Sequence, residues 1–222
     1  MTRYTRCGRI GGMSISGTDA YDSAAGRLPP LVERAPAAAR AHGFPYSCRP
    51  GQGRLLLALA GGARGTIGET GTGCGVGPAW LASGAGEGVR LVSVERAPRR
   101  ARIAAEVFAD RPGVEVLTGD WTRIGERGPY DLLVLDGGGQ GKSEHDPAAA
   151  DVGRLLAPGG TVVLDDFTPA TEWPPTHEGR VDRARLRRLE HPALHTVELP
   201  LAPDLAALVG TRRRCGESGR VT

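Results

Sequence analysis

The stretch Glu69-Thr70-Gly71-Thr72-Gly73-Cys74-Gly75-Val76-Gly77 decides the fold of this 222-residue chain. It follows a short apolar run, Thr66–Glu69, and leads into a helical stretch, Val76–Ser83. Glycines at such a turn let the backbone bend tightly and approach a ligand closely. The helix N-terminus behind them offers free N–H groups to an anion. In a doubly wound sheet this turn lies at the carboxyl end of a central strand, which is where ligands bind.

Outward from this turn, short apolar runs alternate with helical stretches. The expected strands are Thr66–Glu69, Val89–Val94, Val114–Thr118, Asp131–Leu135 and Thr161–Leu164, and the expected helices are Val76–Ser83, Ala97–Ala109 and one that begins at Asp146-Pro147. This alternation indicates an α/β fold with a doubly wound, mostly parallel sheet. Two further strands, Leu194–Leu199 and Leu205–Thr211, are joined by a tight turn and predict a C-terminal antiparallel hairpin that closes the sheet.

The first thirty residues differ from the rest of the chain. Residues 1–30 are rich in Gly, Ser, Thr and Arg and show no sustained apolar period, so we expect a flexible segment or a lid. Residues 31–222 are expected to form a single domain that begins with two cap helices, Leu31–His42 and Gln52–Ala60. Pro36 predicts that the first of these either bends or begins at that residue.

Charge and cysteine content exclude several classes of protein. The formal net charge of +3 is too small to indicate nucleic-acid binding by itself, and the basic runs Arg183–Arg188 and Arg212–Arg214 are interpreted as a solvated helix face and a charged tail. The four cysteines lie far apart and form no CxxC pair, so neither a zinc knuckle nor a thioredoxin-type site is predicted. Scattered thiols fit a reducing compartment.

Hydropathy predicts a protein without a membrane span. No apolar run approaches the ~20 residues that a span needs, and residues 1–12 lack the apolar core of a secretory signal. We therefore expect a cytoplasmic protein.

The glycine motif does not fit the dinucleotide fingerprint. In G-x-G-x-x-G the third glycine would fall on Val76 or Pro78, depending on the register. The pattern E-x-G-x-G-x-G instead resembles the glycine motif of S-adenosylmethionine-dependent methyltransferases. Glu95, at the end of the second strand, could accept hydrogen bonds from both ribose hydroxyls, although a dinucleotide enzyme places its acid there too. Asp120 could accept from an adenine amino group with Trp121 beside the ring, or it could only cap a helix.

A longer set of motifs carries the resemblance. Ser47–Leu56, the glycine motif, Glu95, Gly119-Asp120-Trp121, Leu135-Asp136 and Leu164-Asp165-Asp166 follow one another in the order found in the small class I O-methyltransferases related to the catechol and caffeoyl-CoA enzymes. The resemblance runs from about Leu31 to the C-terminus. It implies a seven-stranded Rossmann-like sheet whose last strand is antiparallel. It also implies S-adenosylmethionine contacts at Glu69, Gly71, Thr72, Gly73, Gly75, Glu95, Arg96, Gly119, Asp120, Trp121 and Asp136.

The same resemblance implies a metal site. In the metal-dependent branch of that family an Asp after strand four and an Asp-Asn pair after strand five hold a divalent cation. Here the matching residues are Asp136, Asp165 and Asp166, so an Asp stands where the family has Asn. Such oxygen ligands suit Mg²⁺. Alternatively, Asp166 caps a loop and Asp136 orients the substrate without a metal.

The relatives place a Lys three residues after the first metal Asp, near the acceptor hydroxyl. In this chain the only lysine is Lys142, six residues after Asp136. It is a candidate general base, since a Lys beside a metal or in an apolar pocket can lose its proton near neutral pH. His145 is the alternative base, and Lys142 and His145 could equally be ordinary surface residues.

These observations predict a methyltransferase that acts on oxygen in a small hydroxylated molecule, with a phenol as one option, and with or without the help of a divalent cation. Three alternatives stay open. They are a methyltransferase for tRNA or another nucleic acid, suggested by the arginines at 183–188, a nicotinamide-dependent oxidoreductase on the same sheet, and a binding protein that performs no turnover. A homodimer is compatible with the sequence, and no membrane partner is expected.

Overall fold

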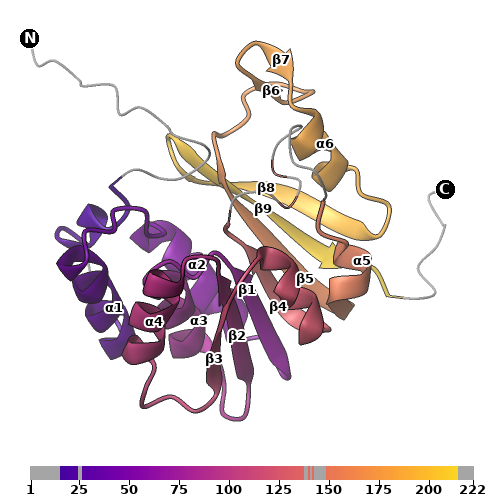
Figure 1. Cartoon of the computed structure of the whole chain (residues 1–222). Coiled ribbons are helices and arrows are strands. Elements are labelled where there is room, and N and C mark those ends of the chain that lie inside the picture. The colour runs from indigo at the N-terminus through magenta and orange to yellow at the C-terminus, as the bar shows by residue number, and fades with distance from the viewer. Residues whose placement is uncertain (1–15, 25–26, 138–139, 141, 143–148, 215–222) are drawn as a thin grey trace, which may run out of the picture.

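The computed structural model describes residues 16–24, 27–137, 140, 142 and 149–214 (Figure 1). Its helices are η1 (Asp19–Tyr21), α1 (Pro30–Ala41), α2 (Pro50–Ala60), α3 (Val76–Gly84), α4 (Pro98–Val107), η2 (Trp121–Glu126), α5 (Val152–Leu155) and α6 (Arg183–Leu189). Its strands are β1 (Thr66–Thr70), β2 (Arg90–Glu95), β3 (Val114–Thr118), β4 (Tyr130–Leu135), β5 (Leu156–Phe167), β6 (Thr176–His177), β7 (Arg180–Val181), β8 (Leu194–Ala202) and β9 (Leu205–Arg212).

One seven-stranded sheet organises the molecule, in the order β3-β2-β1-β4-β5-β9-β8. The first five strands in this order pair in parallel, and β9 pairs antiparallel with both β5 and β8. The predicted doubly wound sheet with a C-terminal antiparallel hairpin is confirmed. The reversal of strand order between β1 and β4 is the topological switch point at which open α/β sheets bind ligands.

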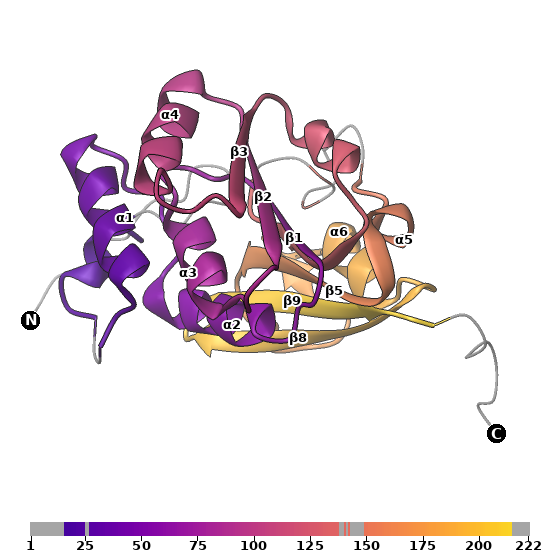
Figure 2. The same cartoon turned by 90° about the horizontal axis from the view of Figure 1, so that it is seen from below.

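Alternate residues of the central strands enter two separate cores. Leu132 and Val134 of β4 pack with apolar side chains of α1, α2, α3 and α4 on one face. Leu133 and Leu135 pack with η2, α5 and β5 residues on the other face. Helices therefore cover both faces, as a sheet of nearly continuous apolar strands requires. Figure 2 shows α1 outside α3 and α4, which it contacts as a second layer.

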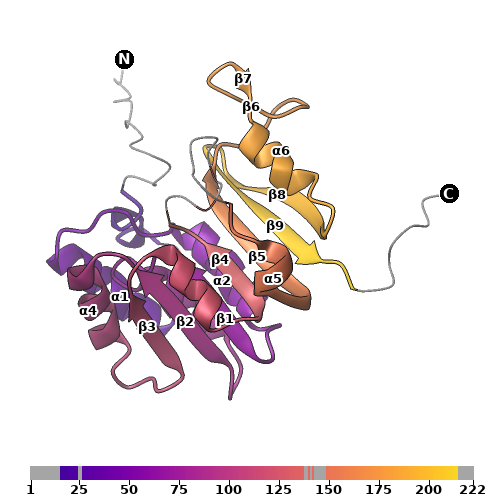
Figure 3. The ribbon, with the colours of Figure 1, turned by 45° about the vertical axis from the view of Figure 1, so that its right-hand side comes forward.

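Some local predictions were wrong. Helix α1 begins at Pro30 and continues through Pro36, so it does not start at Pro36. Proline lacks a backbone N–H, but the N–H of the first helical residue has no partner within the helix in any case. This explains why the helix can start at Pro30. The arginine run predicts a basic helix over Val181–Leu189, but Val181 belongs to β7 and α6 begins only at Arg183. The small β6–β7 hairpin, which projects beyond α6 in Figure 3, was not predicted. The predicted helix start at Asp146-Pro147 lies outside the described residues.

The arginines of α6 correct the interpretation of a solvated basic face. Arg185 and Arg188 are only 2% and 3% exposed. Arg185 Nη1 donates to Thr168 O at 2.9 Å and to Glu198 Oε2 at 3.1 Å, and its guanidinium lies 4.9 Å from the centre of the Phe167 ring. Arg185 and Arg188 therefore form contacts inside the protein, and the 183–188 run does not present a continuous row of exposed arginines to a nucleic acid.

Part of the N-terminal segment is tied to the core. Tyr21 is buried, its hydroxyl donates to Cys48 O at 2.8 Å, and it accepts from Trp80 Nε1 at 2.7 Å. The boundary at residue 30 and a flexible segment or lid before it stay predictions, because residues 1–15 are outside the described part. Among the described residues, no helix combines the length and apolarity that crossing a membrane would require.

Candidate functional site

A cavity of about 430 Å³ opens where the parallel strands end. The residues that line it come from the last residues of β2 and β5, the turns after β1 to β4, the start of α4, and the segment that precedes and begins α2. Among the predicted site residues, those that line it are Gly71, Gly73, Glu95, Arg96, Gly119, Asp120, Trp121, Asp136, Asp165 and Asp166. Residues in distant parts of the sequence therefore meet at one edge of the sheet.

The glycine turn lies against the chain after β4 with almost no clearance. Gly71 has φ of +90°, and a Cβ there would lie 2.7 Å from the backbone nitrogen of Gly137. At Gly73, with φ of +55°, a Cβ would lie 2.8 Å from the Phe44 ring. Side chains at these positions would also meet the strain of the left-handed backbone region. The turn therefore requires glycine for both its conformation and its contacts.

Glu69 and Thr72 lie behind this turn rather than on the cavity wall. Ser93 Oγ donates to Glu69 Oε2 at 2.6 Å and lies 2.6 Å from Thr72 Oγ1. Burial raises the pKa of Glu69 to about 8, although the Ser93 hydrogen bond opposes the shift. Gly75, in the left-handed conformation, is the N-cap of α3. These three residues shape the turn, and their direct contact with a cofactor stays a prediction.

Glu95 is the best-anchored acid of the cavity. Its Oε1 accepts from Ala97 N at 2.8 Å and from Arg100 at 2.7 Å (Nη2) and 2.9 Å (Nε). Its Oε2 accepts from Gly73 N at 2.9 Å, which joins the end of β2 to the glycine turn. A carboxylate oxygen has two lone-pair sites, so Oε2 retains one for a ligand hydroxyl.

Asp120 combines the two alternatives considered from the sequence. Its Oδ1 caps η2 by accepting from Thr122 N at 3.0 Å and Thr122 Oγ1 at 2.7 Å. The backbone hydrogen bond from Thr122 is the main reason why the pKa of Asp120 is lowered. Asp120 and its neighbour Trp121 also line the cavity. The capping hydrogen bonds therefore hold the Asp120 carboxylate in place beside the half-buried Trp121 ring.

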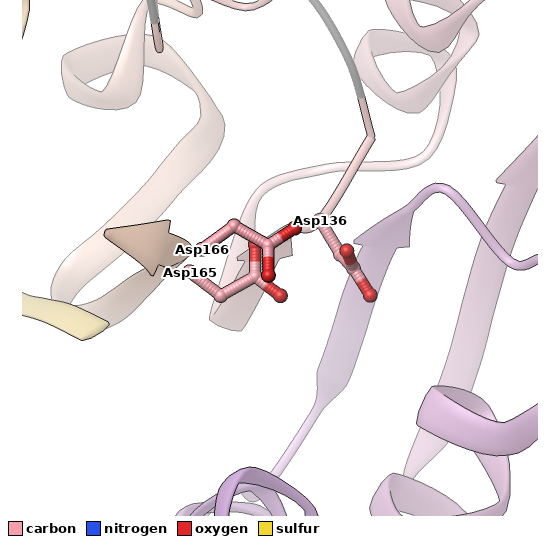
Figure 4. Close-up of side chains that lie close together, drawn as sticks. All are labelled: Asp136, Asp165 and Asp166. Carbon is pink, nitrogen blue, oxygen red and sulfur yellow. The ribbon is translucent and has the colours of Figure 1, made fainter. Parts of the chain in front are cut away.

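Three carboxyl groups lie close together (Figure 4) on the part of the cavity wall next to β4 and β5. This is the end of the cavity away from Glu95 and Asp120, because β2 and β3 lie on the far side of β1 in the sheet. Asp136 follows β4, and Asp165 and Asp166 lie near the end of β5. Each residue offers a carboxylate oxygen, and these oxygens lie within 4.8 Å of one another. Asp166 has φ of +64°, an uncommon conformation for a residue other than glycine. Burial, and next the charge of Asp165, raise the pKa of Asp136 well above its ordinary value.

Lys142 and Gln52 hold the innermost of these acids. Lys142 Nζ lies 2.5 Å from Asp165 Oδ1, and Gln52 Nε2 donates to Asp165 Oδ2. Gln52 Oε1 is buried and has no hydrogen-bond partner among the described residues. Burial lowers the pKa of Lys142, but the charges of Asp165, Asp136 and Asp166 together outweigh burial and raise it. In this arrangement Lys142 is an ammonium, and the other candidate base, His145, lies outside the described residues.

Several residues of the site were not singled out from the sequence. Arg100 anchors Glu95, and its guanidinium lies 5.4 Å from the centre of the Phe44 ring, which also lines the cavity. Gln140 is buried on the cavity wall. No local pattern marks such residues, because their roles arise from contacts between distant segments. Gln52 lies in a segment that the family resemblance did contain.

Comparison with known proteins agrees with this geometry. Residues 69–167 match a family described as a methyltransferase domain. A protein of Mycolicibacterium vanbaalenii named "Putative O-methyltransferase" is 34% identical over 125 residues, which are 52% of this chain and 53% of that protein. The chain thus matches about half the length of this curated relative.

Solved structures extend the likeness over most of the chain. Cofactor-bound Rv0187 from MTB is 25% identical with a TM-score of 0.68, over 90% of this chain and 98% of that one. The O-methyltransferase from Bacillus cereus in complex with SAH, at 21% identity and a TM-score of 0.67, shares the fold over 88% of this chain and 96% of that one.

Proposed function

We propose that this chain, whose residues 69–167 match a family described as a methyltransferase domain, is a class I S-adenosylmethionine-dependent enzyme that transfers a methyl group to a hydroxyl oxygen of a small molecule. The observation that carries the proposal is that one cavity has two chemically different ends. One end, next to β1, β2 and β3, holds the glycine turn, Glu95 and Asp120. The other end, next to β4 and β5, holds three carboxyl groups.

The first end suits the nucleoside of S-adenosylmethionine. Glu95 would accept from a ribose hydroxyl on Oε2, since Arg100 and Ala97 N occupy Oε1 and Gly73 N leaves one lone-pair site on Oε2. Asp120 would accept from the adenine amino group, with Trp121 beside the ring. The backbone of the turn at Gly71 and Gly73 approaches a ligand without a side chain in the way, which suits the methionine part of the cofactor.

The reaction needs alignment more than activation. The acceptor oxygen attacks the sulfonium methyl in line, a C–O bond forms as the C–S bond breaks, and S-adenosylhomocysteine leaves while the hydroxyl proton passes to a base. Holding the two reactants in this geometry supplies a large part of the rate enhancement. The acidic cluster, at the opposite end of the cavity from the nucleoside site, would hold the hydroxyl.

The acidic cluster fits a divalent cation in donor type and charge. Asp136, Asp165 and Asp166 offer only oxygen donors, as Mg²⁺ prefers. With all three ionised their charge is −3, and the Lys142 ammonium reduces it to −2, which one divalent ion would balance. Lys142 therefore offsets the additional carboxylate of Asp166. A bound cation would lower the pKa of the acceptor hydroxyl and fix its direction.

Two residues are proposed to act on the acceptor hydroxyl, one by taking its proton and the other by orienting it. Lys142 would serve as the base only when its pairing with Asp165 is weakened, because that pairing keeps it protonated. Asp136, itself a member of the acidic cluster, lines the cavity and would orient the hydroxyl. Burial of Arg185 and Arg188 leaves only Arg183 and Arg187 of that run exposed, which weakens the reason for a nucleic-acid acceptor and favours a small molecule.

Calorimetric titration tests the cofactor assignment. We expect S-adenosylmethionine and S-adenosylhomocysteine to bind with micromolar affinity and NADH to give no heat. A panel of hydroxylated aromatic acceptors, assayed for S-adenosylhomocysteine release with and without chelator, then tests the reaction and the cation separately. Binding of NADH in place of S-adenosylmethionine would refute the assignment.

A further inference from the structure

Arg188 is a buried cation, and the hydrogen-bond acceptors that it reaches among the described residues are backbone carbonyls. Its side chain, on α6, donates from Nη2 to Gln140 O at 2.7 Å and from Nη1 to Ala150 O at 3.2 Å. Among the described residues, no carboxylate accepts a hydrogen bond from it. Burial lowers its pKa, although an arginine remains charged. A buried charge is costly unless it is well paired, so the residues that Arg188 holds are of interest.

The two carbonyls belong to the two ends of one chain segment. Ala150 N donates to Gln140 O at 3.1 Å, so the same carbonyl accepts from both Arg188 and Ala150. Residues 140 and 150 are thereby held side by side although nine residues separate them in the sequence. Lys142, which reaches Asp165, lies between them.

Gln140 connects this segment to the cavity. Its Oε1 accepts a hydrogen bond at 2.9 Å from Thr70 Oγ1, at the end of β1. Its Nε2 packs so closely on Gly137 that a Cβ on that glycine would lie only 2.8 Å away. Its backbone has φ of +69°. A residue held in this uncommon conformation needs support from its surroundings, and the Arg188 guanidinium supplies it through the carbonyl.

We propose that Arg188 is a positioning residue that fixes the ends of the 140–150 segment, and through them the placement of Lys142 on Asp165. The planar guanidinium suits this task because its two terminal nitrogens donate in fixed directions to two acceptors at once. A lysine would offer a single charged nitrogen and could not span both carbonyls equally well. The kinetic part of the test rests on the proposed function, and the structural part does not.

The sequence provides a single-site probe. Lys142 is the only lysine of the chain, so lysyl endopeptidase has one target, the bond between Lys142 and Ser143. Where local opening is fast relative to cleavage, the rate of cutting follows the population of the open segment. Cleavage kinetics on the full chain therefore report whether the segment is held.

The test compares Arg188→Met with Arg187→Met, whose side chain is exposed on the same helix. We expect Arg188→Met to be cut at least tenfold faster than the unchanged chain and Arg187→Met to be cut at the unchanged rate. Arg188→Gln, which keeps an amide donor and adds no lysine, should be intermediate. Thermal unfolding of each variant shows whether it is folded. If Arg188→Met does not fold, Arg188→Gln and its cleavage rate decide the question. Equal rates for a folded Arg188 variant and Arg187→Met would overturn the proposal.

With an acceptor in hand, steady-state kinetics add a second readout. Arg188→Met should lower kcat about tenfold, because a Lys142 that is no longer held beside the acidic cluster is too rarely in place to take the acceptor proton, even though its pairing with Asp165 is weaker. The KM for S-adenosylmethionine should stay unchanged, because Arg188 supports Lys142 and not the nucleoside end. A general structural defect would instead change both. If no variant and no unchanged protein transfers a methyl group, the proposed function fails, while the cleavage rates still decide the role of Arg188.

Discussion

Lys142 and Asp165 form an ion pair, with Nζ 2.5 Å from Oδ1, that joins the segment after β4 to the end of β5. The Lys142 side chain is 15% exposed and that of Asp165 is 1% exposed. Gln52 of α2 occupies the other oxygen of the same carboxylate. Three segments of the chain thus meet at one acid, and the pair contributes both to the charge of the site and to its rigidity.

Removal of Lys142 should therefore destabilise the protein. Lys142→Met leaves the buried Asp165 carboxylate without its cation, and losing one partner of a buried pair costs ~3–5 kcal/mol. Arg34→Met is a matched control, since Arg34 and Asp110 form an exposed ion pair and such pairs contribute little. Denaturant unfolding should show a large loss for the first variant and almost none for the second. Similar losses in both would contradict a special role for the Lys142 pair.

The sheet could be predicted from the sequence because apolar strands have a strong signal. Strand Val114–Thr118 has the predicted bounds, and β1, β2 and β4 begin and end within one residue of their predicted bounds. Only β5 differs clearly among the parallel strands, since it is longer than predicted at both ends. The glycine turn, Glu95 and the three aspartates were placed correctly at one sheet edge, because the ends of parallel strands share an edge.

The interior roles of polar residues could not be predicted in the same way. Arg185 and Arg188 occur in a run of arginines that has the composition of a solvated face, and only the packing of α6 on the sheet reveals that they are buried. Gln52 and Gln140 likewise depend on partners from distant segments. The β6–β7 strands have two residues each, too few for an alternating pattern.

Glu95→Gln should weaken cofactor binding. The substitution removes the charge that Arg100 pairs with and turns one of the two acceptor oxygens into a donor group, so we expect the affinity for S-adenosylmethionine to fall at least tenfold, which is ~1.4 kcal/mol. Glu115→Gln is the control, because Glu115 forms an ion pair with Arg127 and does not line the cavity. Calorimetry should give unchanged affinity for the control. Retained affinity in Glu95→Gln would exclude Glu95 as the ribose acceptor.

Gly71→Ala should damage the glycine turn. The added methyl group would lie 2.7 Å from Gly137 N in a residue with φ of +90°, so it adds a collision to the ~1 kcal/mol strain of the left-handed conformation. Gly43→Ala isolates the strain, since Gly43 has φ of +66° and nothing lies within 4 Å of its Cβ position. We expect Gly71→Ala to be the less stable variant and to lose cofactor binding. Equal stability would show that the turn relaxes without cost.

Asp166→Asn should weaken divalent cation binding, and Lys142→Met should strengthen it. The first change removes one negative charge from the cluster, and the second removes the positive charge that offsets it. Titration with Mn²⁺, followed by its paramagnetic resonance, should give about tenfold changes in opposite directions, which is ~1.4 kcal/mol each. The double variant has the charge of the unchanged protein and should bind with similar affinity. A Lys142→Met variant that binds Mn²⁺ less tightly would contradict the charge balance proposed above.

The raised pKa of Glu69 predicts how stability depends on pH. The folded protein keeps the Glu69 proton up to a pKa of about 8, whereas the unfolded chain loses it near the ordinary pKa of ~4.3. Between these values the folded state binds one proton more than the unfolded state. The free energy of unfolding therefore falls as pH rises through this window, by ~1.4 kcal/mol per pH unit from this group. Glu69→Gln lacks the group but keeps the neutral shape of the protonated carboxyl. The difference in unfolding free energy between the two proteins, measured by denaturant titration from about pH 5 to 8, should therefore move steadily in favour of the variant, and parallel curves would show that Glu69 is ionised in the folded protein.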